Sequence, residues 1–305
     1  MTIVQPPGEG PGFWAGAPSA AHDAAEDRFL LCYRLRRPLA EGRGYRCVIA
    51  ASADGVAFEE IWAVSSAEWG TPSIERSALV RAPEGWRLYV SSVDPADNRW
   101  RIDLLSAPRV EGFAASERRE AMTAASTRTE GVKDPVVWLQ DGATWMLIPY
   151  GPATGADLSA QHATGNLFAT GRHPHPTALA VSDDGARFRW LGDAILPGAP
   201  GAWDSGVARA SALIRRGDIW SLFYDGRTGH GDIYEDRTGL AVSGDGRHFT
   251  KVSLDGPLLA SPWGTGCLRY LSILQRPEST LYYYECCRPD GSHELRLNVV
   301  GGGGR

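Results

Sequence analysis

Three acidic residues stand shortly before short aromatic segments of the chain and could carry its chemistry. They are Glu75 in Ile74-Glu75-Arg76, Asp134 in Lys133-Asp134-Pro135 and Asp204 in Trp203-Asp204-Ser205. Two carboxyl groups can divide acid–base work, because different environments let one donate a proton while the other stays ionised and stabilises positive charge. Like charges crowded together raise at least one carboxyl pKa, which suits a proton donor at neutral pH.

Side chains that could bind a sugar lie close to the same motifs. The cations are Arg76, Lys133, Arg209 and Arg269, the aromatic candidates are Trp14, Trp203 and Tyr270, and Glu285 ends the last aromatic segment. Guanidinium groups hold hydroxyl or anionic groups of a ligand. If these cations pair with the acids instead, the carboxyl pKa values fall and catalysis is disfavoured.

Each acid also has a structural interpretation. Asp134 could cap a turn before Pro135, Glu75 could form an ion pair with an arginine, and Asp204 could belong to an Asp-Ser-Gly turn. Packing in the core or at a rim explains Trp14 equally well. His173 and His175 form only a weak metal motif, since no third ligand is evident, and His22, His230 and His293 are isolated. We expect no cofactor and identify no metal ligands, and the sequence leaves open a cation at the centre of the fold.

A repeated strand predicts the elements that would position these residues. Short segments opened by an aromatic residue or Leu begin at Phe29, Trp86, Trp145, Trp220 and Leu281, at intervals of 57, 59, 75 and 61 residues. The long third interval predicts an insertion of about 15 residues between Gly151 and Pro176.

A second repeat, S-x-D-G-x-x-F, occurs at 52–58, 182–188 and 243–249 and is typical of tight turns between strands. Several short strands in each period of about 60 residues predict a propeller. Five periods predict one all-β domain, a five-bladed β-propeller over residues 1–305, with flexible tails at about 1–12 and 300–305. A pair of β-sandwiches is the alternative architecture. A short helix is expected within 114–125.

The S-x-D-G-x-x-F turns, the Lys133-Asp134-Pro135-Val136-Val137 segment and the Trp220 to Gly226 segment resemble the five-bladed glycoside hydrolases. This superfamily contains arabinanases, β-xylosidases, invertases, levansucrases and mannoside phosphorylases, as in glycoside hydrolase families 43, 32 and 130. The resemblance runs from about Gly12 to Asn298. It implies a central funnel with acids on the innermost strands, in which Asp134 matches the essential Asp-Pro carboxylate and Glu75 the general acid.

The first blade departs from this pattern. Many relatives carry an Asp-Pro there, whereas this chain has Gly16-Ala17-Pro18-Ser19, with Ala17 in place of the acid. The departure leaves open a rearranged mechanism, a phosphorylase-like one, or binding without catalysis.

Composition and net charge narrow the classes of partner and cellular location that are expected for this chain. The net charge of −5 disfavours nucleic acid as a partner, and no apolar run is long enough to span a membrane. No secretory signal is evident, and the five cysteines show no disulfide spacing, so we expect reduced thiols and a cytoplasmic location. The leading prediction is an enzyme that cleaves a glycosidic bond in a small carbohydrate. The alternatives are a non-catalytic carbohydrate-binding propeller and a lyase or isomerase acting on a sugar-like metabolite.

Overall fold

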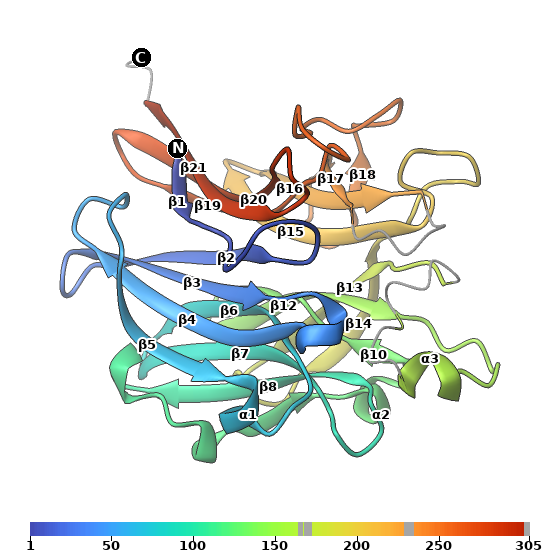
Figure 1. Cartoon of the computed structure of the whole chain (residues 1–305), viewed down its shortest axis with the longest axis horizontal. Helices are drawn as coiled ribbons and strands as arrows, with labels where there is room; N and C mark the ends of the chain where they lie inside the picture. Colours follow the sequence, from blue (N-terminus) through green and yellow to red (C-terminus); the bar gives the residue numbers. More distant parts are fainter. Residues whose placement is uncertain (164–166, 168–172, 229–234, 302–305) are drawn as a thin grey trace.

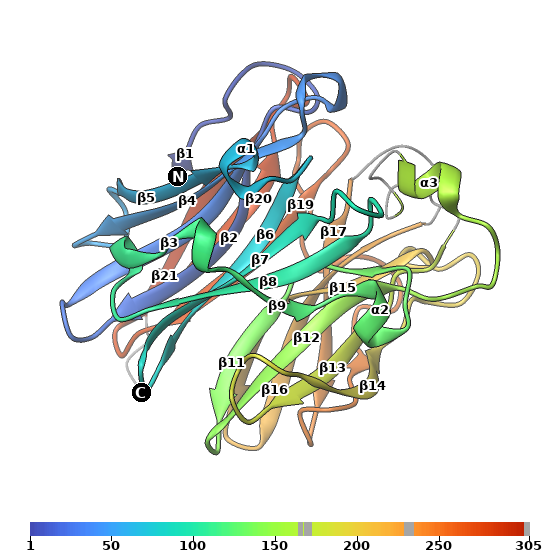
Figure 2. The same cartoon turned by 90° about the horizontal axis from the view of Figure 1, so that it is seen from below.

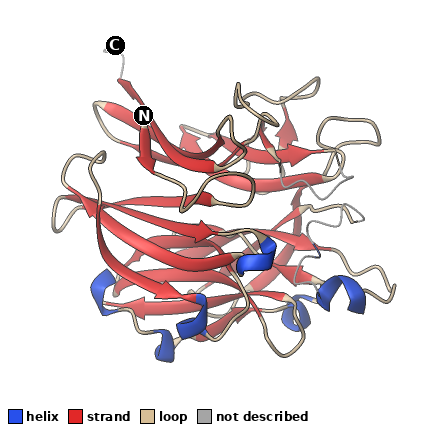
Figure 3. Cartoon of the chain, viewed as in Figure 1, coloured by secondary structure: helices blue, strands red, loops and turns tan. Residues whose placement is uncertain are grey.

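The computed structural model describes residues 1–163, 167, 173–228 and 235–301 and is built almost wholly of antiparallel strands (Figures 1 and 3). The strands form sheets of eight, five, four and four members. The eight-stranded sheet is continuous only through one parallel pair, Trp14 with His293. We divide it at this pair into two strand groups, so that the described strands fall into five groups.

The first and second groups run through the N-terminal part of the chain. Their strands are β2 (Trp14–Asp23), β3 (Arg28–Arg36), β4 (Gly44–Ser52) and β5 (Glu59–Ser65), then β6 (Ile74–Ala82), β7 (Gly85–Val93), β8 (Trp100–Ala107) and β9 (Arg119–Met122). Short helical turns lie between and after them: the 3₁₀ turn Leu39–Glu41, α1 (Ser66–Trp69), the 3₁₀ turns Val110–Gly112 and Ala115–Glu117, and α2 (Ala124–Thr127).

The remaining groups follow in chain order. The third contains β10 (Gly131–Val132), β11 (Val136–Gln140), β12 (Ala143–Gly151), β13 (Thr177–Ser182) and β14 (Arg189–Ile195), with α3 (Ser159–Ala163) between β12 and β13. The fourth contains β15 (Val207–Arg216), β16 (Ile219–Arg227), β17 (Arg237–Ser243) and β18 (Thr250–Lys251). The fifth contains β19 (Leu268–Gln275), β20 (Ser279–Cys287) and β21 (His293–Gly301), and β1 (Thr2–Val4) pairs with β21.

The aromatic repeat becomes the second strand of four groups (β3, β7, β16 and β20) and β12 in the third group, where β10 and β11 both precede it and pair with it. Strands β3, β7 and β12 are apolar on both faces, and each lies between two neighbouring hydrophobic clusters. Leu88 of β7 packs in the cluster shared with the first group, and the next residue, Tyr89, packs in the cluster shared with the third. Successive side chains of a strand point to opposite faces, so one apolar run serves two cores.

Hydroxyl groups link each strand group to the next around the centre of the molecule. Each accepts a hydrogen bond from a backbone N–H of the next group: Ser19 from Leu79, Ser91 from Asp134, Thr177 from Ala210, Ser211 from Leu271 and Ser272 from Ala20. The five links join the first group back to the fifth. In Figure 2 the strands β6 to β8 lie between the group of β2 to β5 and the group of β11 to β14.

The predicted all-β propeller architecture is confirmed, and the count of five blades remains our interpretation of the strand groups. The insertion lies between β12 and β13 as expected, and its residues 164–166 and 168–172 lie outside the described part. Two expectations are wrong. The segment 114–125 is interrupted by strand β9, and the N-terminal tail contains β1 because its residues complete the edge of β21. No helix in the described part of the chain is long and apolar enough to cross a membrane.

Candidate functional site

The innermost strands approach one another around a pocket in which cations predominate. Among the described residues its lining is Arg34, Arg36, Glu75, Lys133, Pro149, His175, Val207, Arg209, Arg227, Asp236, Arg269 and Tyr270. Six of these side chains are cationic and two are carboxylates. The side chains fill most of the pocket, since the free space left for water is about 20 Å³.

Local distortions of the inner strands turn residues toward this pocket. The pairing is irregular between Gly16 and Ser19 in β2, between Ile74 and Ser77 in β6 and between Arg269 and Ser272 in β19. Bulges of this kind redirect side chains and are common beside active sites. Ala17, Asp134 and Tyr270 all have a left-handed backbone, with φ between 53° and 56°. Ala17 thus has the same left-handed backbone as Asp134. This fits the expectation that Ala17-Pro18 takes the place of an Asp-Pro motif in the first group.

Glu75 lies on β6 and is ion-paired. Its Oε2 accepts a hydrogen bond from Arg34 Nε at 2.8 Å, and the side chain is buried. Burial opposes ionisation, but Arg34, Lys133, Arg36 and Arg43 outweigh it and hold the pKa of Glu75 well below its usual range. A carboxylate held ionised does not donate a proton at neutral pH. The expected role of general acid is therefore not supported by its surroundings, and an electrostatic role is.

Asp134 lies in the turn between β10 and β11 and is completely buried. Its Oδ2 is 3.3 Å from Lys133 Nζ and 3.7 Å from Arg209 Nη1, and it accepts a hydrogen bond from Tyr270 Oη at 3.2 Å. Burial raises the pKa of the Tyr270 phenol well above its usual range, so this lining group keeps its proton. Lys133 also lies over the ring of Trp100. Asp134 and Tyr270 thus lie together beside Arg209.

Asp204 is not part of this cluster. The innermost strand of its group begins at Val207, so Asp204 precedes the strand instead of lying on it. Its Oδ2 is 2.5 Å from Lys251 Nζ and accepts a hydrogen bond from Tyr224 Oη at 2.8 Å. Trp203 stacks on Tyr224 and donates its indole N–H to the carbonyl of Ser253. Both residues are outside the pocket lining, which corrects their expected position.

Two more expected ligand-binding residues have structural contacts. The Trp14 ring stacks on His293 at 4.6 Å between centroids and lies against the guanidinium groups of Arg36 and Arg269, so it is covered by protein. Arg76 is buried beside the pocket and donates to backbone carbonyls of three inner strands, those of Pro18, Ser211 and Leu271. Arg76 thereby ties the strands together at the centre of the molecule.

The other expected residues meet in the pocket. Arg209 bridges Asp225 and Asp236, and Arg269 binds Glu285, whose Oε2 is also 3.0 Å from Arg34 Nη2. Asp225 lies behind the lining on β16, and burial raises its pKa against the attraction of Arg209.

Five polar lining residues were not among the side chains expected to bind a ligand: Arg34, Arg36, His175, Arg227 and Asp236. Arg34 and Arg36 alternate along β3, so both side chains point to one face. This alternation of two arginines is the sequence feature that could have predicted both as lining residues. His175 was assigned to the insertion, yet it is buried in the pocket, where burial and nearby cations lower its pKa well below the usual range. His230 lies outside the described residues.

The chain matches no protein-family model, and no curated protein matches it in sequence. Solved structures of β-propeller glycoside hydrolases and phosphorylases do match its fold. A thermostable family-43 glycoside hydrolase is 15% identical, with 95% of this chain and 93% of that chain covered and a TM-score of 0.68. The β-1,2-mannobiose phosphorylase from Listeria innocua is 16% identical, with 98% and 94% covered and a TM-score of 0.66. A glycosyl hydrolase from Bacteroides ovatus is 12% identical, with 97% and 85% covered and a TM-score of 0.64. The chain has the fold of this class of protein.

Proposed function

We propose that this protein is a carbohydrate-active enzyme that acts on a glycosidic bond in its central pocket and that its ligand carries negative charge. The observation that carries the proposal is the pocket lining, with six cations against two carboxylates. The charge could belong to the sugar, as a carboxylate or phosphate group, or to inorganic phosphate acting with the sugar. The similarity to a mannobiose phosphorylase supports the second source.

The excess of positive charge extends behind the lining. Among the described residues, eight cations gather here against five carboxylates. The cations are Arg34, Arg36, Arg43, Arg76, Lys133, Arg209, Arg227 and Arg269. The carboxylates are Glu75, Asp134, Asp225, Asp236 and Glu285. Three positive charges are in excess, and all eight except Arg227 are buried. An anionic ligand would be attracted to this cluster, because charges interact more strongly where water is largely excluded.

Arginine suits the binding of an anionic ligand better than lysine would. A guanidinium group presents paired N–H donors that match the oxygen atoms of a carboxylate or a phosphate. Arg34, Arg209 and Arg269 are held in place by Glu75, Asp225 and Glu285. The pocket is therefore ordered before a ligand enters, which lowers the entropic cost of binding.

For the cleavage step we assign Asp134 and Glu75 to stabilising positive charge on the sugar carbon, while water or phosphate attacks that carbon and its proton ends on the leaving oxygen. Tyr270 lines the pocket, keeps its proton, and holds Asp134 in place through its hydroxyl group. We expect Tyr270→Phe to retain ligand binding and to lower kcat several-fold, the rate equivalent of losing one hydrogen bond of about 1 kcal/mol.

The experiment is calorimetric titration of the full chain with sugars that differ only in charge. The pairs are galactose with galacturonate and mannose with mannose 1-phosphate, and inorganic phosphate is titrated separately. We expect binding of an anionic member, weakened by added salt, and at least tenfold weaker binding in Arg227→Gln. Arg46→Gln, which removes an exposed guanidinium, is the matched control and should bind normally. Equal binding of charged and neutral sugars, or binding of neither, would contradict the proposal.

A second candidate is an anionic-carbohydrate-binding protein without catalysis. It is favoured by the ion pairs of Glu75, Asp134 and Asp204, which engage all three predicted acids. Aryl glycosides and disaccharides, assayed with and without phosphate, separate the candidates. Turnover only with phosphate indicates phosphorolysis, turnover without it indicates hydrolysis, and saturable binding without turnover indicates the non-catalytic protein.

A further inference from the structure

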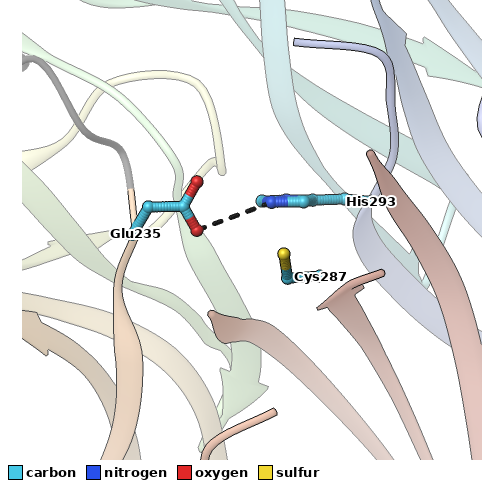
Figure 4. A group of neighbouring side chains, drawn as sticks. All are labelled: Glu235, Cys287 and His293. Atoms are coloured by element: carbon cyan, nitrogen blue, oxygen red, sulfur yellow. Dashed lines mark ion pairs between the residues drawn. The ribbon is translucent and has the colours of Figure 1, made fainter. Parts of the chain in front are cut away.

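A buried histidine beside the pocket faces an acid and a thiol that the proposed function does not use. His293 begins β21 and is completely buried, and its Nδ1 lies 2.7 Å from Glu285 Oε1. Its Nε2 has no hydrogen-bond partner among the described residues, and Glu235 Oε2 is 3.6 Å away. Figure 4 shows the Glu235 carboxylate and the nitrogen-bearing edge of the His293 ring pointing toward each other, with the Cys287 sulfur beside the gap.

We propose that Glu235, Cys287 and His293 bind a Zn²⁺ ion. Their ligand atoms, one carboxylate oxygen, one thiol sulfur and one imidazole nitrogen, lie within 4.8 Å of one another. Around tetrahedral zinc, with metal–ligand distances of about 2.0 Å to N and O and 2.3 Å to S, neighbouring ligand atoms are roughly 3.3–3.7 Å apart. The observed N–O separation of 3.6 Å is already in this range. The sulfur lies within 4.8 Å of the other two ligand atoms and would move closer to them on binding.

The second-shell contacts of His293 fit this assignment. Metal-bound histidines usually donate their other ring N–H to a carboxylate, which fixes the ring and leaves the lone pair on the ligating nitrogen. Glu285 accepts this bond from Nδ1 and is itself held by Arg34 and Arg269. The stacked Trp14 ring restrains the imidazole from one face. Nε2 is thereby aimed at Glu235 and Cys287.

The donor set selects the metal. A thiolate and an imidazole favour zinc over magnesium and calcium, which prefer oxygen ligands. Three protein ligands leave one tetrahedral position for water. The site adjoins the pocket, since Glu235 precedes the lining residue Asp236 and Glu285 contacts the lining residues Arg34 and Arg269.

A proton is the alternative occupant of the site. Burial opposes protonation of His293, but contacts with Cys287, Glu235 and Glu285 raise its pKa to about 9. In the metal-free protein the imidazolium then bridges the two carboxylates, and the Cys287 thiol donates to the carbonyl of Arg288 at 3.3 Å.

The test uses the full chain, stripped with a chelator and titrated with Zn²⁺ against a chromophoric competitor. We expect one equivalent of zinc by elemental analysis and, with Co²⁺ in its place, a thiolate-to-metal charge-transfer absorption. Cys287→Ala should abolish this absorption and, like Glu235→Gln, weaken zinc binding by more than about 100-fold, since even loss of a second-shell partner costs 10–100-fold. Cys286→Ala is the matched control, because its neighbouring thiol is not part of the cluster, and it should bind zinc normally.

His293→Gln could fail to fold because Glu285 depends on it, so the conclusion rests on the Cys287 and Glu235 variants, with folding checked by circular dichroism. The proposal is wrong if the stripped protein takes up no zinc, or if Cys287→Ala and Glu235→Gln bind it as tightly as the unaltered chain. It is also wrong if cobalt binds without the charge-transfer absorption. None of these measurements depends on enzymatic activity, so the proposed function is tested separately.

Discussion

Arg34 and Glu75 form an ion pair between two strand groups, with Arg34 on β3 and Glu75 on β6. Both side chains are almost completely shielded from water. Removing one member of a buried pair leaves the other charge without compensation, which is more costly than losing a surface pair. The ion pair therefore stabilises the packing of the two strand groups as well as the arrangement of charges in the pocket.

We expect Glu75→Gln to lower the free energy of unfolding by about 3 kcal/mol at pH 7. The pKa of Glu75 is depressed in the folded protein, so its stabilisation is present above the unfolded pKa, roughly 4.3, and is lost as the pH falls through the folded value. The difference between the two proteins should therefore shrink below about pH 4. Urea denaturation over a pH series measures it.

Glu60→Gln is the control, because Glu60 pairs with Arg46 at the surface, where an ion pair contributes at most about 1 kcal/mol. A Glu75→Gln protein as stable as this control would show that the buried pair is not needed.

Gly16 leaves room for Glu285 at the pocket. A Cβ atom at this position would lie 2.2 Å from Glu285 Oε2 and 2.6 Å from its Cγ. We expect Gly16→Ala to displace Glu285 from Arg34 and Arg269, to cost about 1–3 kcal/mol of stability, and to weaken anion binding. Thermal unfolding and ligand titration check both effects. Gly256→Ala, where a Cβ meets nothing within 4 Å, should leave both unchanged.

At the scale of elements, the S-x-D-G-x-x-F turns connect β4 to β5, β13 to β14 and β17 to β18, and two of them also bond to a neighbouring group. In the turn after β13, the Ser182 hydroxyl accepts from Gly185 N and the Asp184 carboxylate from Ala186 and Arg187 N. These bonds lower the pKa of Asp184 to about 2. Gly185 has φ near +72°. Its carbonyl then accepts a hydrogen bond from Tyr89 in the preceding group.

The turn at Gly55 makes the same contact with Tyr283 of the fifth group, at 2.7 Å. We expect Tyr89→Phe and Tyr283→Phe each to cost about 1 kcal/mol, the net value of one buried hydrogen bond. Tyr282→Phe on the same strand is the control, because no hydrogen bond of its hydroxyl is present among the described residues. Denaturant midpoints measure the three variants. Equal midpoints for all of them would mean that these contacts do not stabilise the packing of neighbouring groups.

At the scale of the whole molecule, the chain closes on itself through its ends and around its centre. β1 pairs with β21, and Ser272 of the fifth group accepts from Ala20 N of the first. We expect Ser272→Ala to cost about 1–3 kcal/mol, because it leaves a largely buried backbone N–H without its acceptor. Ser279→Ala, on β20 outside this set of links, should change stability by less than about 0.5 kcal/mol. Unfolding in urea compares the two, and similar losses would contradict a special role for Ser272.

The sequence was sufficient to predict the strands and their repetition. Apolar two-sided strands and Asp-Gly turns are local signals, and five copies of one strand at similar spacing indicated the propeller. It also pointed to Asp134, Arg209, Arg269, Tyr270 and Glu285, which lie in or beside the pocket because residues just before the repeated strand, and the acid at the end of its last copy, come to the centre of the fold. Their roles stay predictions.

Only the tertiary structure decided which charges meet. Glu75 depends on Arg34 of another strand group, and Asp204 binds Lys251 of β18 instead of reaching the pocket. His175, expected in the insertion as part of a weak metal motif, and His293, isolated in the sequence, are buried among charged residues from several elements. The physical reason is that pKa and ion pairing depend on distances of a few ångströms between side chains far apart in the chain. Local sequence determines how each strand forms, whereas the closure of the sheets determines the electrostatics of the site.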